Sequence, residues 1–365
     1  MAERGSVVRA GAQPAPDPTI DFAAAVRAAT KLAPTGPVVT PQQAADAVAA
    51  LLRFSRESEL TVRDTAELGE GLPVAEAVVV DRPGWIAATS QGMAKLTAPL
   101  TARLADKATP RSRAMAGRQL GVVLGFLSGK VLGQFDPLTS GPDGQDGQLL
   151  LVAPNIIKVE RELRLDPVDF RRWVCLHEST HRLQFTAVPW LRDYFVAQTA
   201  EFGAVADVDS REVLGRMVRA IRAGSGRRGA DSSTAETGKL SWVEAMQTPE
   251  QRAIFDRMMA LMSLLEGHAD YVMDAVGPAV VPSVAGIRKA FSERRRKGSG
   301  PIDRMLRSLL GMDMKLSQYV KGEKFVSHVV KAVGMQRFNT VWDSPETLPT
   351  RAEIADPAGW LRRVG

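Results

Sequence analysis

Residues 177 to 181 have the spacing in this chain that most directly predicts chemistry. They read His-Glu-Ser-Thr-His, an HExxH pattern, in a stretch that starts at the helix-start signal Asp166-Pro167. Two histidines four residues apart project from one face of a helix, so both rings can reach one metal ion. The chain has only 4 histidines, and the pattern contains two of them. We predict that His177 and His181 bind zinc and that Glu178 is the general base of a hydrolytic reaction. The alternative is an ordinary helix with core or solvated histidines.

A catalytic zinc site needs a third protein ligand and an open position for water. The stretch from Pro249 to Val276 has helical spacing, and within it Glu266 and Asp270 lie four residues apart on one face. A carboxylate in an otherwise apolar helix needs a partner such as a metal. We expect Glu266 to bind zinc and Asp270 to accept the other ring N–H of a ligand histidine. His268 is the next candidate ligand, and a surface salt-bridge stripe is the alternative.

These residues are compatible with more than one function. The first is a metallopeptidase, which cleaves peptide bonds by metal-assisted hydrolysis. The second is a zinc amidohydrolase acting on a non-peptide metabolite, and the third is a non-catalytic helical scaffold that zinc stabilises. Candidates for stabilising an oxyanion, on residue type alone, are Tyr271, Tyr319 and His328, the last of which is equally well explained as a core histidine. Cys175 is turned away from the ligand face and is expected to be a buried side chain.

Composition narrows the class of protein. The 365 residues are 45% hydrophobic and 24% charged, which is typical of a globular protein. A single cysteine excludes internal disulfides and Cys-rich zinc fingers, and with no signal-peptide pattern it predicts a cytoplasmic location. The net charge of +6 lies largely in short runs such as 294–297, so we predict no nucleic-acid binding. The apolar stretch 120–135 is too short to span a membrane.

The remaining pattern predicts a mainly α protein with a small β-sheet. Helices are expected at 21–33, 41–54, 166–185 and 249–276, and strands at 77–80 and 149–152. Segment 85–88 fits a helix start or a second strand. The strand at 149–152, which precedes a proline, is expected at a sheet edge, where an extended substrate could pair with it. Loops are expected at 140–148, 223–239 and, rich in arginine, 292–301.

The domain organisation follows from these elements. Residues 1–18 form an expected disordered leader, and residues 19–365 one catalytic body. That body has a helical N-terminal portion, about 19–140, and a portion with the metal site, about 141–365. Glycines at 117, 121, 125, 129 and 133 form one helical stripe, which favours close helix packing over a membrane dimer face. The oligomeric state is open.

Several stretches are similar to a known family, among them VVDRPGWI, KVLGQFDP, LLLVAPNI, DFRRWVCLHESTHRLQF and LLEGHADYVMD. HExxH followed by a distant Glu-x-x-Ala-Asp resembles the gluzincin branch of zinc metallopeptidases. More closely, the chain from about Ile20 to Val364 resembles the actinobacterial zincin-like metallopeptidase type 2 family. The resemblance implies a zincin-like fold, zinc as cofactor, His177, His181 and Glu266 as ligands and Glu178 as base. It does not imply the physiological substrate, and we expect a peptide or protein from the hydrolytic chemistry of the site. Members of the family are associated with deazaflavin coenzyme biosynthesis by genomic co-occurrence. The separation of His181 and Glu266 is longer than in thermolysin-like enzymes.

Overall fold

The computed structural model describes residues 19–102, 108–142, 144–205, 249–297 and 312–364. This part of the chain is mainly helical with a small sheet, which confirms the predicted fold class. The helices before the metal site are α1 (Phe22–Leu32), α2 (Pro41–Ala66), α3 (Arg82–Ala102), α4 (Pro110–Leu127) and α5 (Ala153–Glu162). Those that follow are α6 (Pro167–Thr186), α7 (Leu191–Val205), α10 (Pro249–Val280), α11 (Val284–Lys297), α13 (Met312–Val333), α14 (Met335–Phe338), α15 (Arg351–Ala355) and α16 (Pro357–Val364), with short 3-10 turns η2 (Asn339–Trp342) and η3 (Pro345–Thr347).

The sheet has three strands in the order β1-β3-β2. Central strand β3 (Gln148–Val152) runs parallel to β1 (Val78–Val80) and antiparallel to β2 (Gly133–Asp136). The expected edge position of 149–152 is therefore wrong. Every residue from Leu149 to Val152 is buried, as in a strand covered on both faces. Pro154 lies beyond the strand, in the first turn of α5, where a missing N–H costs nothing.

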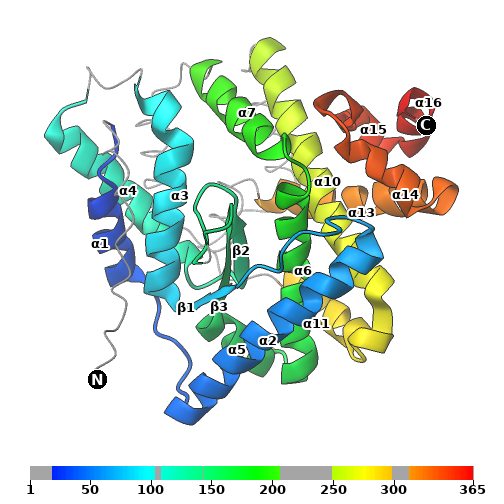
Figure 1. Cartoon of the computed structure of the whole chain (residues 1–365). Helices are drawn as coiled ribbons and strands as arrows, with labels where there is room; N and C mark the ends of the chain where they lie inside the picture. The colour runs from blue at the N-terminus through cyan, green and yellow to red at the C-terminus, as the bar shows by residue number, and fades with distance from the viewer. Residues whose placement is uncertain (1–18, 103–107, 143, 206–248, 298–311, 365) are drawn as a thin grey trace, which may run out of the picture.

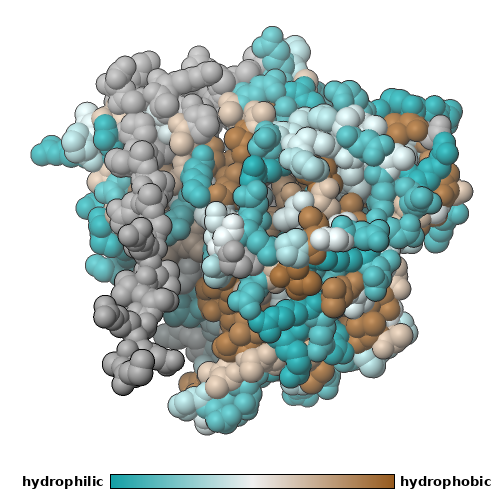
Figure 2. Space-filling model, in the orientation of Figure 1, coloured by the Kyte–Doolittle hydropathy of each residue, from teal (hydrophilic) through white to brown (hydrophobic). Residues whose placement is uncertain are grey.

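The sheet lies between two groups of helices (Figure 1). Leu150 and Val152 pack with α1, α3 and α4 in one core cluster. Leu149 and Leu151 pack with α2, α6 and α10 in another. A third cluster joins α7 and α10 to the C-terminal helices. The face of the molecule that Figure 2 shows is mostly hydrophilic, with hydrophobic residues near its middle.

The glycine stripe provides close packing between α4 and α1. A Cβ on Gly117 would lie 2.1 Å from the carbonyl oxygen of Asp21, and one on Gly121 would lie 2.6 Å from that of Ala25. Only glycine lets two helix backbones approach this closely. The stripe is shorter than predicted, because α4 ends at Leu127 and residue 133 belongs to β2. No described helix is long and apolar enough to cross a membrane.

Several predicted boundaries differ from the structure. α2 continues to Ala66, twelve residues beyond the predicted end, because strong helix formers and no breaker follow Phe54. Segment 85–88 lies within α3 and is helical. Residues 292–297 belong to α11 and not to a loop, since glutamate, arginine and lysine are good helix formers. α10 is interrupted at Gly277 (φ 65°), close to its predicted end. Segments 1–18 and 223–239 lie outside the described residues.

An ion pair between Glu353 of α15 and Arg363 of α16 joins the last two helices. Nε and Nη2 of Arg363 donate to the two carboxylate oxygens of Glu353, at 2.8 and 2.9 Å. The bonds from Arg363 lower the pKa of Glu353 from 4.5 to about 2. Since the folded-state pKa is the lower one, the pair stabilises the fold fully above about pH 4.5 and ceases to do so as the pH falls through about 2.

We therefore expect Arg363→Met to lower the free energy of unfolding by about 1 kcal/mol at pH 7, because the pair is partly exposed and screened by solvent. At pH 3 the difference from the wild type should be smaller, and what remains comes from the bonds that Arg363 donates to the carbonyls of Glu346 and Leu348, which do not depend on pH. Urea titrations at the two pH values measure this, and an equal loss at both would contradict the role of Glu353.

Candidate metal centre

Helix α6 holds the HExxH residues. It begins where predicted, because the carboxylate of Asp166 accepts hydrogen bonds at 2.9 Å from the backbone N–H groups of Val168 and Asp169. Asp169 in turn accepts a 2.7 Å bond from the backbone N–H of Ser283, which ties α6 to the segment before α11. Cys175 is buried as predicted, and burial raises the pKa of its thiol. The helix is thus fixed at its start and packed along its length.

Three predicted ligands meet between α6 and α10. One donor atom each from His177, His181 and Glu266 lies within 4.8 Å of the others. The two histidine Nε2 atoms are 3.2 Å apart, and each lies 3.7 Å from Oε2 of Glu266. Two atoms bound to one tetrahedral zinc at 2.0–2.1 Å are about 3.3 Å apart. Two imidazole nitrogens and one carboxylate oxygen at these separations therefore fit a zinc ion with one open position.

Glu178 lies beside this group, with 7% of its surface exposed. Strand β2 approaches it so closely that a Cβ on Gly133 would lie 2.5 Å from its Cγ and 2.8 Å from its Oε1. Burial raises the pKa of Glu178 to about 7, and the charge of Glu266 adds to this effect while His181 opposes it. The carboxyl group can therefore gain and lose a proton near neutral pH.

The Nδ1 atoms of His177 and His181 have different neighbours. Nδ1 of His181 lies 2.9 Å from Oε1 of Gln184, and Nδ1 of His177 lies 3.2 Å from the sulfur of Met273. Burial lowers the pKa of His181, but its contacts with Glu266 outweigh burial and raise it to about 9. A metal ion at this ring therefore competes with a proton.

Gln184 and Met273 are not among the site residues predicted from the sequence. The helix period places Gln184 one turn after His181, but its bond to Leu265 and the contact of Met273 with His177 depend on packing between α6 and α10. The predicted role of Asp270 stays a prediction. Its backbone carbonyl accepts a 2.9 Å bond from Arg288.

The remaining candidates lie elsewhere. His268 is fully buried, stacks against Phe338 and is outside the donor group, and burial lowers its pKa to about 3. His328 is exposed on α13, so the core location considered for it is wrong. Tyr271 is partly buried between two core clusters. The side chain of Tyr319 lies outside the described residues.

A cavity of about 390 Å³ opens over the three ligands. Helices α3, α6, α7 and α10 and strand β2 form its wall, so the N-terminal portion of the chain contributes to the site. The wall next to the ligands is mostly apolar, and its larger side chains are Met93, Leu96, Phe135, Leu138, Phe185, Phe195, Met262 and Leu265. No lysine or arginine is among the described residues that line it.

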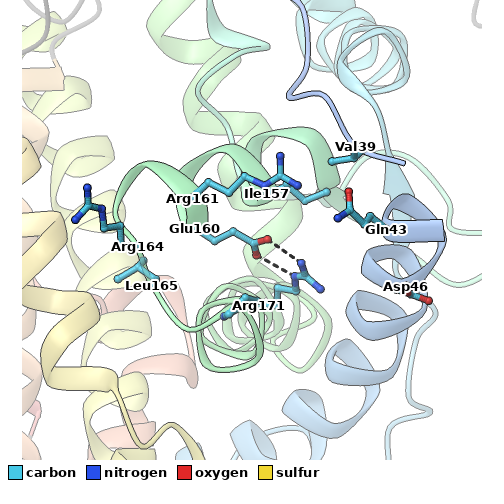
Figure 3. A pocket seen from close by; sticks show the side chains of 10 residues that line it. Val39, Gln43, Asp46, Ile157, Glu160, Arg161, Arg164, Leu165 and Arg171 are labelled. Carbon is cyan, nitrogen blue, oxygen red and sulfur yellow. Dashed lines mark hydrogen bonds and ion pairs between the residues drawn. The ribbon is translucent and has the colours of Figure 1, made fainter. Parts of the chain in front are cut away.

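A second cavity, of about 510 Å³, lies between the start of α2 and helices α5 and α6 (Figure 3). Most of its charged side chains bond within the protein. Arg171 forms two bonds to Glu160, at 2.8 and 3.0 Å, and Arg161 donates to the carbonyl of Val38 at 2.9 Å. Figure 3 shows Arg164 at its edge, pointing away from this pair. These contacts explain the charges as structural.

The site and the helical fold together define a zincin-type protein. Residues 20–361 match the family described as zincin-like metallopeptidase, and the chain belongs to that family. It is similar to a protein from Chloroflexus aurantiacus whose crystal structure is described as that of a "putative hydrolase with a novel fold". The two share 33% identity over 94% of this chain and 98% of the other, with a TM-score of 0.68. The comparison with curated proteins gives no match. These matches do not bear on the deazaflavin association of the family.

Proposed function

We propose that this protein is a zinc-dependent hydrolase that cleaves peptide bonds. The observation that carries the proposal is the convergence of His177, His181 and Glu266 beside the buried carboxyl group of Glu178. Membership of the zincin-like metallopeptidase family and similarity to a protein described as a "putative hydrolase" support it. A scaffold role explains the ligands but not a base with a pKa near 7 beside them.

The chain's residues divide the chemistry between them. When bound, zinc supplies a Lewis acid that polarises a carbonyl group and acidifies water. His177, His181 and Glu266 would hold it. Glu178 takes the proton of the attacking water and passes it to the leaving nitrogen, a double role that suits a pKa of about 7.

The edge of the sheet offers a place for an extended substrate. β2 pairs with β3 on one side only, and no other described strand pairs with it. Its residues Gly133 to Asp136 line the cavity over the ligands. A peptide that adds to β2 by main-chain hydrogen bonds would pass beside Glu178. The apolar wall, in which Phe185 lies one turn beyond His181, favours a large apolar side chain next to the cleaved bond.

The proposal is tested by cleavage of a peptide library with zinc-loaded, chelator-treated and zinc-restored protein. We expect cleavage with zinc, loss of cleavage with the chelator and recovery on restoration, with a preference for large apolar residues at the cut. A panel of non-peptide amides run in parallel separates a peptidase from an amidohydrolase. Zinc-loaded protein that cleaves no peptide would overturn the peptidase assignment.

Close packing of β2 predicts that Gly133→Ala impairs catalysis. The added methyl group would lie 2.5 Å from Cγ of Glu178, so the carboxylate must move. A shift of about 1 Å costs on the order of 10²-fold in rate. We expect kcat/KM for peptide cleavage to fall about 10²-fold while bound zinc is unchanged. The control is Gly286→Ala in α11, where nothing lies within 4 Å of the added Cβ. Equal activity of the two variants would contradict the prediction.

A further inference from the structure

We propose that Gln184 is a positioning residue that holds the ring of His181 with its Nε2 atom free for the metal. In this arrangement the backbone carbonyl of Leu265 and the ring of His268 fix the Gln184 amide. The inference rests on the proposed role of His181 as a zinc ligand.

The contacts run through one fully buried side chain. Gln184 has no exposed surface and lies three residues after His181 on α6. Its Oε1 atom lies 2.9 Å from Nδ1 of His181. Its Nε2 atom lies 2.9 Å from the carbonyl oxygen of Leu265 and 3.0 Å from Nδ1 of His268. Both the oxygen and the nitrogen of the Gln184 amide therefore have hydrogen-bond partners.

The carbonyl of Leu265 determines which way the amide points. A backbone carbonyl oxygen only accepts hydrogen bonds, so the Gln184 atom facing it must be the NH2 group. Oε1 then faces His181, and because this oxygen also only accepts, Nδ1 of His181 must carry the proton. The nitrogen of His181 that remains to bind the metal is Nε2, the atom directed at His177 and Glu266.

The second N–H of Gln184 requires an acceptor, which His268 supplies. Nδ1 of His268 accepts only when the ring is neutral with its proton on Nε2. That Nε2 atom is buried and has no hydrogen-bond partner among the described residues. The ring itself is packed against Phe338 and Trp342. A buried N–H without a partner is costly, so it needs an explanation. The bond from Gln184 explains it, because it needs Nδ1 of His268 as the acceptor and so leaves the ring proton on Nε2.

The same amide connects the two helices that carry the ligands. Gln184 and His181 belong to α6, while Leu265 directly precedes Glu266 on α10. Holding the Leu265 carbonyl thus sets the separation between His181 and Glu266 as well as the ring orientation. Outer partners of metal ligands typically change metal affinity by about 10 to 100-fold when mutated.

The first test measures zinc affinity by competition with a chromophoric chelator. Gln184→Met keeps the side-chain length and removes both hydrogen-bonding groups, so we expect zinc to bind about 10 to 100-fold more weakly. Thr180→Val is the matched control, because it removes a buried hydrogen bond from the same helix, to the Leu176 carbonyl, without touching a ligand. Equal affinities of the two variants would overturn the proposal.

Substitutions of His268 separate the acceptor from simple packing. His268→Asn can place an amide oxygen near the position of Nδ1 and should retain most of the zinc affinity. His268→Leu fills space without an acceptor and should bind zinc more weakly. The reverse order would contradict a role for His268 in holding Gln184.

A third test uses only the zinc-loaded wild type, so its result does not depend on whether a variant folds. Long-range ¹H–¹⁵N correlation spectra report which nitrogen of each histidine carries a proton, and the chain has only 4 histidines. We expect the proton on Nδ1 of His181 and on Nε2 of His268. A proton on Nδ1 of His268 would overturn the proposal. Wild type that binds no zinc would instead defeat the proposed function, whereas zinc bound equally well by Gln184→Met would defeat only this inference.

Discussion

Glu178→Gln should slow hydrolysis by about 10³-fold and leave the metal site intact. The amide keeps the size of the side chain but cannot take a proton from water, and a positioned general base contributes about 10²–10⁴-fold to a rate. We expect kcat/KM for the best library peptide to fall about 10³-fold. Because Glu178 lies beside the three ligands and is not one of them, bound zinc should equal that of the wild type.

The controls separate loss of the base from loss of the fold. Circular dichroism and zinc content are measured on the same samples, and Glu162→Gln, on the surface of α5, removes a carboxylate away from the site. A protein that binds zinc only as a scaffold should be indifferent to the change at Glu178. Activity within tenfold of the wild type would show that another group is the base.

Glu59→Gln should be among the most destabilising substitutions in the described part of the chain. Oε1 of Glu59, on α2, lies 2.5 Å from Nη1 of Arg182, the residue that follows His181. Glu59 also forms an ion pair with Arg63, one helical turn away. The side chains of Glu59 and Arg182 are 2% and 3% exposed. Removing one partner of a buried ion pair leaves an uncompensated charge and costs about 3–5 kcal/mol. We expect a loss of that size in the free energy of unfolding, measured with urea.

The control is a surface pair with the four-residue spacing of Glu59 and Arg63. Glu162 lies four residues from Lys158 within α5, and the two side chains are 44% and 40% exposed. Glu162→Gln should cost less than about 1 kcal/mol, because solvent screens the pair. Similar losses for the two glutamine variants would contradict the importance of burial at Glu59.

The part of the site that could be predicted is local. His177, Glu178 and His181 lie within five residues, so the helix period alone brings them together. Glu266 could be predicted because a carboxylate in an apolar helix needs a partner. Gln184 and Gly133 depend on packing between distant segments, since one bonds to Leu265 and the other lies against Glu178.

The fold, too, could be predicted only where the signal is local in the sequence. The helix-start signal at Asp166 predicted the start of α6, because a cap acts within one turn. The place of β3 in the sheet could not be predicted. A short apolar run is compatible with both an edge and a central strand, and Pro154 follows β3 because it lies in the first turn of α5, not because β3 is at an edge. Which strand lies beside the site is decided by pairing between β2 and β3.

Metal content tests the central claim most directly. The wild type, His181→Ala and Glu266→Ala are dialysed identically after zinc reconstitution and analysed by elemental mass spectrometry. We predict one zinc per chain in the wild type and its loss in both variants, because each removes one of three converging donors. A wild type that holds no zinc, or variants that keep it, would contradict a metal centre at His177, His181 and Glu266.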